Sequence, residues 1–411
     1  MTRSTRLIPP ALLSLIPAAF GSFPPQRQHT DLARMADSMV SARVAADAFS
    51  GAVLVARGGK IEYQRAAGLA DRERGTAMQL NSQIQIASAT KLFTQIAIRQ
   101  LEQAGKLSLT DTVGKFLPDY PNSVVRSRVT VEQLLRHRSG VGSFWNAKFM
   151  AQAPNIRSVH DYMQLFQDDS LLFEPGSSEA YSNGGYVLLG AIIEQVSGLS
   201  YHDYLREKVF RPAGMTETVP YDSRVTRSNA AIGYTSQPLD APLTGDRRLA
   251  GSGPRPGYER RDSAPTGNPA PTLRIMGPDG RQLSPEAARE AMARRAASAG
   301  PRRPNTGIQP GMSGPAGDHY STVGDFLKLA NTLLGHRLLD SARTTALLGV
   351  RYAAGQDFRA NGGGPGTNAE FSIYPGGEVI VVLSNYDPPS GTAVAQFLRS
   401  LIAPPAAAAP H

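Results

Sequence analysis

The sequence predicts an α+β fold in which one antiparallel sheet is built from strands at both ends of the chain. Near the N-terminus, two runs of strand-forming residues, 49–57 and 60–64, flank a tight turn at Gly58-Gly59. Near the C-terminus, the alternating run 371–374 and a turn precede the continuous apolar run 379–383, which is typical of a strand buried on both faces. We therefore expect helices to flank this sheet and a mostly helical region to be inserted between its strands.

The helices are predicted from apolar residues at helical spacing and from the residue types that begin and end helices. Thr130 is a typical N-cap, and Gly198 is a typical stop after the apolar positions 188, 192 and 196. The helices expected in this way lie over residues 31–46, 91–105, 132–136, 188–198, 200–212 and 392–402. The last of them is expected to pack on the C-terminal hairpin.

Composition indicates a globular protein with an uneven charge distribution. The chain has 411 residues, of which 41% are hydrophobic and 19% charged, enough for one large domain or two medium ones. We expect a single domain over 30–402. The net charge is +9, and twelve arginines against six acidic residues between 246 and 310 supply +6 of it. The sequence has no cysteine, which excludes disulfides, thiolate chemistry and metal sites with cysteine ligands.

Residues 237–310 are rich in Pro, Gly and Arg and are predicted to form a flexible basic insertion within the domain. A basic segment can also bind nucleic acid or another anionic polymer. The arginine pairs here alternate with Pro and Gly, and Tyr258 is the only aromatic residue among them. These features favour a solvated loop, so we expect no nucleic-acid partner. The Ala- and Pro-rich tail over 403–411 is expected to be disordered.

The first residues have the pattern of a secretory signal peptide. Arg3 and Arg6 precede an apolar run over 7–20, with small residues around Gly21. We predict a signal peptide over 1–24, the alternative being an ordinary disordered N-terminus. The run is too short for a membrane span, and no other stretch approaches that length. We therefore expect export to the periplasm, with no transmembrane segment left after cleavage.

Ser88-Ala89-Thr90-Lys91 is the candidate nucleophile motif. Positions i and i+3 of a helix share a face, so the serine Oγ and the lysine Nζ can meet there. A serine hydroxyl needs an adjacent base to attack at neutral pH, and a desolvated lysine can be that base. The spacing alone also fits a solvated helix start. Apolar residues on both sides of the motif favour a buried site.

Several stretches together resemble the serine β-lactamase and penicillin-binding-protein superfamily, in particular its class C-like branch of esterases, carboxypeptidases and D-aminopeptidases. Tyr181-Ser182-Asn183 is similar to the second motif of that family, although these residues alone also fit a turn. Further similar stretches are 50–56, 107–111, 129–140, 174–183, 211–215 and 320–322. The resemblance implies a β-lactamase/transpeptidase-like fold over roughly residues 49–385, apart from the basic insertion.

The resemblance also implies roles for the motif residues. Ser88 would attack an acyl carbonyl and form an acyl-enzyme. Lys91, with a lowered pKa, would help to remove the serine proton, and Tyr181 would relay that proton and later activate the deacylating water. Asn183 would orient Lys91 and hold the substrate amide. The backbone N–H groups of Ser88 and of a strand residue near Gly363 would form the oxyanion hole.

The chain departs from this family at its third motif, a Lys or His followed by one residue and then Gly. Without gaps Ala360 occupies the position of the cation, and with one residue deleted Asn361 does. Arg359 is close by, but neighbouring residues of a strand point to opposite faces. Losing a charge-assisted contact costs about 1.5–3 kcal/mol, or roughly ten- to a hundredfold in rate.

The predicted function is that of a serine acyl-hydrolase that cleaves an ester, a β-lactam or a D-amino-acid amide of a small-molecule or peptidoglycan-like substrate. Esters are favoured, because a simple ester carries no carboxylate that needs the missing cation. The alternative is a catalytically weak or silent relative that binds cell-wall fragments or a protein partner. His137 and His319 are interpreted as structural. No metal or organic cofactor is predicted, since the sequence contains neither an H-E-x-x-H motif nor a P-loop.

Overall fold

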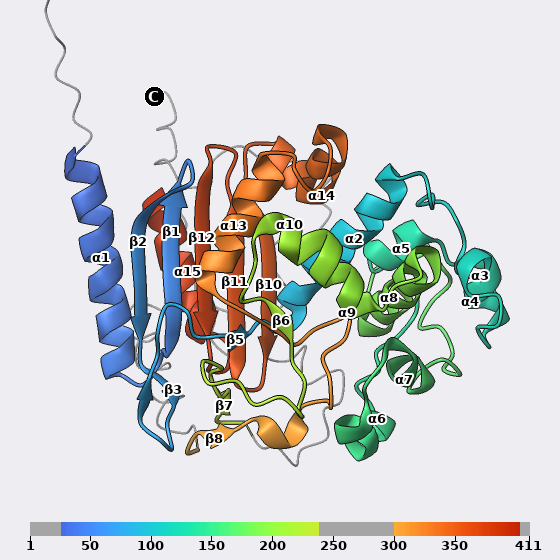
Figure 1. The fold of residues 1–411 in the computed structure, drawn as a ribbon, viewed down its shortest axis with the longest axis horizontal. Coiled ribbons are helices and arrows are strands. Elements are labelled where there is room, and N and C mark those ends of the chain that lie inside the picture. Colours follow the sequence, from blue (N-terminus) through green and yellow to red (C-terminus); the bar gives the residue numbers. More distant parts are fainter. Residues whose placement is uncertain (1–25, 238–299, 403–411) are drawn as a thin grey trace, which may run out of the picture.

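The computed structural model describes residues 26–237 and 300–402, with side chains placed from residue 31. Its central element is a five-stranded antiparallel sheet in the order β10-β11-β12-β1-β2 (Figure 1). The strands are β10 (Phe358–Gly364), β11 (Thr367–Ile373), β12 (Glu378–Ser384), β1 (Gly51–Arg57) and β2 (Lys60–Ala67). The predicted α+β class is confirmed, because this sheet joins strands from the two ends of the chain.

Side-chain alternation explains the sequences of the central strands. In β12, Val379, Val381 and Leu383 belong to the main core beneath the helical region, whereas Ile380 and Val382 belong to a second core on the opposite face. A strand buried on both faces must be apolar throughout. The turn between β1 and β2 places its two glycines at positive φ, 54° and 79°, which the twist of a two-residue hairpin favours.

Helices α1 (Gln26–Ala45) and α15 (Ser390–Ile402) cover one face of the sheet (Figure 1). In α1, Leu32, Ala36 and Val40 recur every fourth residue and form one buried stripe. Val394 and Leu398 of α15 complete the same core. Both helices agree with the predicted ranges, except that α1 begins five residues earlier than expected. No helix within the described ranges has the length and apolar character that crossing a membrane requires.

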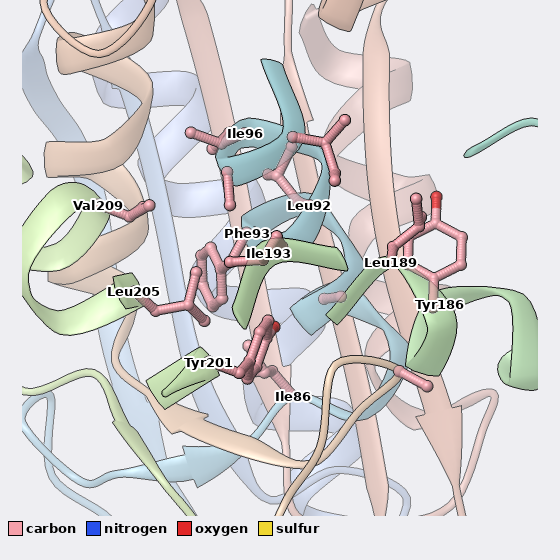
Figure 2. Close-up of a cluster of buried hydrophobic side chains, with 14 of the residues drawn as sticks. Ile86, Leu92, Phe93, Ile96, Tyr186, Leu189, Ile193, Tyr201, Leu205 and Val209 are labelled. Carbon is pink, nitrogen blue, oxygen red and sulfur yellow. The ribbon is translucent and has the colours of Figure 1, made fainter. Parts of the chain in front are cut away.

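The opposite face of the sheet is covered by α13 (Val323–Leu334), α2 (Lys91–Gln103) and α14 (Ser341–Ala353), beyond which lies the inserted helical region (Figure 1). At its centre is α8 (Asn183–Ser197), which packs on α2 through Tyr186, Leu189 and Ile193 (Figure 2). The remaining helical elements of this region are α3 (Val113–Phe116), α4 (Ser123–Arg128), α5 (Val131–Leu135), α6 (Ala147–Gln152), η2 (Ala153–Asn155), α7 (Val159–Gln164), α9 (Tyr201–Tyr204), the π-helical turn η3 (Leu205–Phe210) and α10 (Arg211–Ala213).

The predicted signals for helix ends act as expected in this region. The Thr130 side chain accepts from the backbone of Gln133, whose side chain in turn accepts from the Thr130 N–H, so the two form a capping box at the start of α5. Gly198 ends α8 at a φ of 72°, a left-handed conformation that glycine adopts without steric cost.

Three small sheets tie the loops together: β3 (Leu69–Asp71) with β4 (Thr76–Ala77), β5 (Ile84–Gln85) with β9 (His319–Ser321) and β6 (Val219–Pro220), and β7 (Tyr234–Thr235) with β8 (Arg303–Pro304). The last pair corrects the prediction that the flexible insertion extends to residue 310. β8 and the turn η4 (Thr306–Ile308) lie inside that range, and Asn305 between them is 2% exposed. The polar composition of 300–310 gave no sign of a strand, because the partner strand, β7, precedes the insertion in the sequence.

The predicted signal peptide over 1–24, most of 237–310 and the tail over 403–411 lie outside the described residues.

Candidate active site

The candidate nucleophile lies where β5 ends and α2 begins. Ser88 is in the 3-10 turn η1 (Ala87–Thr90), and Lys91 is the first residue of α2. Ala87 has a φ of 43°, uncommon for a residue other than glycine. Lys91 Nζ lies 3.3 Å from Ser88 Oγ and donates a hydrogen bond to it. The predicted meeting of the two side chains is thus present, although the serine is in a 3-10 turn and not in the α-helix itself.

Lys91 is buried, with 5% of its surface exposed, and lies within a set of acceptors. Its Nζ donates to Asn183 Oδ1 at 2.8 Å and to the carbonyl oxygen of Ala316, in addition to Ser88. The ring of Tyr181 lies 4.8 Å from Nζ, in a cation–π arrangement. A buried ammonium is tolerated only where its N–H groups find acceptors. The same contacts that satisfy Lys91 therefore also hold Nζ beside the serine.

Tyr181 faces Ser88 from the segment before α8. Its hydroxyl donates to Ser88 Oγ at 2.6 Å, and the side chain is 37% exposed, so the phenol lies at the surface of the site. The ring of His137 lies 4.7 Å from that of Tyr181. His137 Nδ1 accepts from the Ser182 N–H at 3.1 Å, and its carbonyl oxygen accepts from the Ala180 N–H at 3.0 Å. His137 thus holds the segment on both sides of the tyrosine.

Asn183 is the first residue of α8 and connects two parts of the site. Its Oδ1 accepts from Lys91, and its Nδ2 donates to Ser143 Oγ at 3.2 Å. Ser182 caps the helix by accepting from the Gly185 N–H at 2.7 Å. Because both ends of the Asn183 amide are occupied, the orientation of the amide is fixed with its oxygen toward the lysine.

Ser88 and Asn183 open onto one pocket whose walls come from distant parts of the chain. The other lining residues are Ala87, Phe144, Trp145, Ile308, Gln309, Ala316, Gly317, Asp318, Gly363, Gly364, Pro365 and Thr367. Gly363, the predicted oxyanion-hole residue, is therefore in the same pocket as Ser88. Asp318 is the one charged side chain among these lining residues.

The third-motif position lies on β10, against the nucleophile turn. A Cβ on Gly362 would be 2.0 Å from the Ile86 carbonyl oxygen, so only glycine fits there. Ala360 lies two residues earlier and therefore on the same face of the strand, packed against the main core, whereas Asn361 is exposed on the other face. Arg359 also lies on that other face, and its Nε donates to Asp357 at 2.6 Å. The gap-free alignment, with alanine in place of the cation, is therefore the one that the structure favours.

His319 lies on β9, away from the pocket lining. Its ring is enclosed by Phe93, Tyr201, His202 and Phe210, and neither ring nitrogen has a hydrogen-bond partner within the described residues. Burial, and then the neighbouring His202, lower the pKa of His319 well below its usual value. These contacts agree with a structural role. Across the described ranges, no group of three or more His, Asp or Glu side chains is placed so that it could hold a metal ion.

The sequence analysis missed several residues of the site. Ser143 and Ala316 bind Asn183 and Lys91, and Asp318 lines the pocket, but none of them belongs to a recognisable catalytic motif. Only their position in the sequence could have indicated Ala316 and Asp318, because residues 314–318 shortly precede the family-like stretch 320–322. Phe144 and Trp145, whose rings stack at 5.5 Å, add an aromatic wall that no motif marked.

The sheet, the inserted helical region and the serine facing a lysine and a tyrosine together define the fold and site of a superfamily of serine hydrolases. The chain belongs to the Beta-lactamase family, whose model matches residues 36–403. It is 37% identical over 181 residues to Penicillin-binding protein 4* of Bacillus subtilis (strain 168). That alignment covers 43% of this chain and 39% of the relative, so the chain matches well under half of that protein's length.

Solved structures share the fold over nearly the whole chain. The penicillin-binding protein from Bacillus halodurans has a TM-score of 0.65 at 23% identity, covering 88% of this chain and 99% of that one. EstCE1, described as a hydrolase with promiscuous acyltransferase activity, has a TM-score of 0.61 at 21% identity, covering 91% and 99%. At these identities the likeness shows the fold and not the substrate.

Proposed function

We propose that this protein is a serine acyl-hydrolase that forms an acyl-enzyme on Ser88 and acts preferentially on esters. One observation carries the proposal: Ser88 lines the pocket, and its Oγ lies 2.6 Å from the Tyr181 hydroxyl and 3.3 Å from Lys91 Nζ. A nucleophile within hydrogen-bonding distance of proton-accepting groups is the arrangement that covalent catalysis needs.

In acylation, Ser88 Oγ bonds to the acyl carbon of the ester. Tyr181 and Lys91 act as one proton-accepting pair, which in its reactive form lacks one proton and takes it from Ser88. The negative charge that develops on the carbonyl oxygen is stabilised by the backbone N–H groups of Ser88 and Gly363. The C–O bond to the alcohol then breaks, and the alcohol leaves with the proton that the pair has held.

In deacylation, a water molecule replaces the alcohol. The same pair takes a proton from the water as its oxygen bonds to the acyl carbon, and the proton returns to Ser88 Oγ when the bond between Ser88 and the acyl group breaks. Asn183 keeps Lys91 in place through both steps by way of its 2.8 Å hydrogen bond. The net reaction consumes one ester and one water and yields an acid and an alcohol.

The preference for esters rests on the third-motif position. β-Lactams and D-alanyl peptides present a carboxylate, which the family's third-motif cation would bind. Ala360 has no charge to offer, and Arg359 is bound to Asp357 on the other face of β10. Compared with a family member that has the cation, binding of such a substrate lacks a charge-assisted contact of about 1.5–3 kcal/mol. A simple ester has no carboxylate, so its binding is unaffected by the missing cation.

The test is intact-mass labelling with a fluorophosphonate probe. We expect a single adduct on the wild type and none on Ser88→Ala. Ser108→Ala is the matched control, because Ser108 is an exposed serine in a loop outside the pocket lining. Absence of any adduct on folded wild-type protein, together with no turnover of short-chain esters, would contradict the proposal.

A second candidate function follows from the same substitution. A family member with alanine at the third-motif position can keep the fold and lose turnover, and then act by binding cell-wall fragments or a protein partner. Ala360 is the observation that favours this alternative. Ser88-dependent turnover above background would exclude it. An unlabelled protein that still binds peptidoglycan fragments would support it.

A further inference from the structure

Three side-chain amides, those of Asn305, Gln85 and Gln309, form a hydrogen-bonded row beside the pocket. Asn305 Nδ2 donates to the Pro365 carbonyl oxygen at 2.9 Å and to Gln85 Oε1 at 3.2 Å. Gln85 Nε2 in turn donates to Gln309 Oε1 at 3.1 Å. Pro365 and Gln309 both line the pocket that contains Ser88. This amide row therefore begins and ends at the pocket wall.

The first contact of the amide row sets the orientation of all three amides. A side-chain amide has one accepting end and one donating end, whereas a backbone carbonyl can only accept. Asn305 must therefore direct its nitrogen toward Pro365, and the same nitrogen lies beside Gln85. Gln85 has to accept with its oxygen, which leaves its nitrogen to donate to Gln309. Gln309 has to accept with its own oxygen, so its nitrogen remains for another partner.

Burial and further backbone contacts hold the amide row in place. Gln85 is 4% exposed and Asn305 is 2% exposed, so little water can reach a polar atom that loses its partner. The Thr367 hydroxyl donates to the Gln85 carbonyl oxygen, and the Asn305 N–H donates to the Gly233 carbonyl oxygen at 2.8 Å. Turning one amide around would bring like ends together and leave buried polar atoms unpaired, which is energetically costly.

Gln309 Nε2 has no hydrogen-bond partner within the described ranges, although its side chain is partly buried in the pocket lining. Two other polar side chains of the lining are engaged by the protein: Asn183 Nδ2 donates to Ser143 Oγ, and the Thr367 hydroxyl donates within the fold as described above. A fixed donor that faces a substrate pocket favours a substrate with an acceptor at that place.

We propose that Gln309 determines substrate specificity by donating from Nε2 to a second carbonyl oxygen of the ester, and that Asn305 and Gln85 are the positioning residues that hold it in this orientation. A ketone oxygen is a neutral acceptor, so its desolvation costs less than that of a carboxylate in a pocket whose third-motif position is alanine. This inference rests on the proposed hydrolase function and names its substrate class, which is esters that carry a further carbonyl group.

The test compares esters in which a terminal methylene group of the same shape replaces the ketone oxygen. Ethyl levulinate and its methylene analogue carry the group in the acyl part, whereas acetonyl butyrate and methallyl butyrate carry it in the alcohol part. Each kcat/KM is divided by the rate constant of hydroxide hydrolysis, which removes differences in intrinsic reactivity. We expect the wild type to prefer the ketone in at least one pair. Gln309→Met should lower that ratio of ketone to methylene ester about two- to tenfold, the effect of one neutral hydrogen bond.

Two substitutions within the amide row separate the donor from the shape of the side chain. Gln309→Glu keeps an oxygen for Gln85 and removes only the donor, so it should lower the ratio at least as much as Gln309→Met. Gln85→Glu offers Gln309 an acceptor instead of a donor. The Gln309 amide should then turn its nitrogen toward residue 85 and its oxygen toward the pocket, and the ratio should fall although Gln309 itself is unchanged. The rate of fluorophosphonate labelling of Ser88 should stay near the wild-type value in all three variants.

Gln64→Glu is the matched control, because Gln64 is exposed on β2, at the edge of the sheet opposite to β10. It should leave the ratios of both pairs unchanged. Unchanged ratios of both pairs in Gln309→Met and Gln309→Glu would overturn the inference. An equal fall for the ketone and methylene esters would also overturn it, because a merely structural role of Gln309 predicts that result.

A binding experiment keeps the inference testable if turnover fails. In the Ser88→Ala background, ligand-observed NMR compares the ketone and methylene esters of each pair, with and without Gln309→Met. Stronger binding of a ketone ester that is lost in the double variant supports the inference, and equal binding within both pairs overturns it. Ser88-dependent turnover with ratios that do not respond to residue 309 would overturn this inference alone. Absence of turnover of every ester would contradict the proposed function instead.

Discussion

Restoring a cation on β10 is the most direct way to test why this pocket should disfavour carboxylates. Ala360 lies on the same face of β10 as Gly362, which contacts the nucleophile turn, so a lysine introduced at 360 would lie on the side of the strand that faces this turn. Asn361→Lys is a matched control, because it adds the same charge one residue along, on the exposed opposite face.

The gain can be estimated from the contact that is added. A lysine ammonium that donates to a substrate carboxylate contributes about 1.5–3 kcal/mol, or roughly ten- to a hundredfold in kcat/KM. The change also has a structural cost, since Ala360 packs partly buried against the main core and is paired with the fully buried Phe371. Overpacking of this kind costs about 1–3 kcal/mol of stability, although a lysine stem can bury its methylenes and keep its head in water.

The assay uses monoethyl methylmalonate and ethyl isobutyrate, which differ only in a carboxylate replaced by a methyl group. We expect Ala360→Lys to raise the ratio of their kcat/KM values at least tenfold, and Asn361→Lys to leave it near the wild-type value. A folded Ala360→Lys protein that labels at Ser88 but keeps the wild-type ratio would refute the reasoning, as would an equal rise in both lysine variants.

Two further predictions concern the Tyr181 hydroxyl and the buried histidines. Tyr181→Phe removes the hydroxyl that lies 2.6 Å from the nucleophile, and we expect the rate of fluorophosphonate labelling to fall by about 10²- to 10⁴-fold. Tyr352→Phe on α14 is the control, and a fall of less than threefold in Tyr181→Phe would contradict the assigned role. Burial lowers the pKa of His202 to about 4 and that of His319 well below its usual value, so between pH 6.5 and 4 the unfolded state binds protons that the folded state does not. The free energy of unfolding should therefore decrease as the pH falls through this window, by on the order of 3 kcal/mol from His202 alone and further from His319, as measured by urea titration. His202→Gln should remove part of that decrease. A flat profile would show that both histidines stay accessible to protons in the folded state.

The sequence alone was sufficient where the structure depends on local rules. The glycines at 58 and 59 predict the hairpin, because few other residues adopt two consecutive positive φ angles. The spacing of Ser88 and Lys91 predicts that their side chains meet, because a single helical turn, whether α or 3-10, brings them together. In both cases the residues that decide the geometry are neighbours in the chain.

Prediction was insufficient where the geometry depends on segments that meet only in the folded protein. Lys91 binds Asn183, 92 residues away, and Ala316, 225 residues away, and no local pattern encodes those distances. β8 is polar and contains a proline, so it resembles the loop before it, yet it is ordered by pairing with Tyr234 and Thr235 from before the insertion. Asp318 stayed unnoticed for the same reason: its position beside the nucleophile comes from a backbone hydrogen bond to Ala87.

The site is divided between segments with separate roles, and this division bears on how its specificity can change. The residues to which we assign the proton transfers and the acyl bond, Ser88, Lys91, Tyr181 and Asn183, come from η1, from α2 and from the segment that leads into α8. Other lining residues of the pocket come instead from β10, at Gly363 and Gly364, and from the segment before β9, at Asp318. We therefore expect that a substitution on these two segments can change the preferred charge of the substrate without altering the serine, its lysine or its tyrosine. The labelling of Ser88 and the relative rates for charged esters can therefore be measured independently. The loss of the third-motif cation alone does not imply a loss of catalysis.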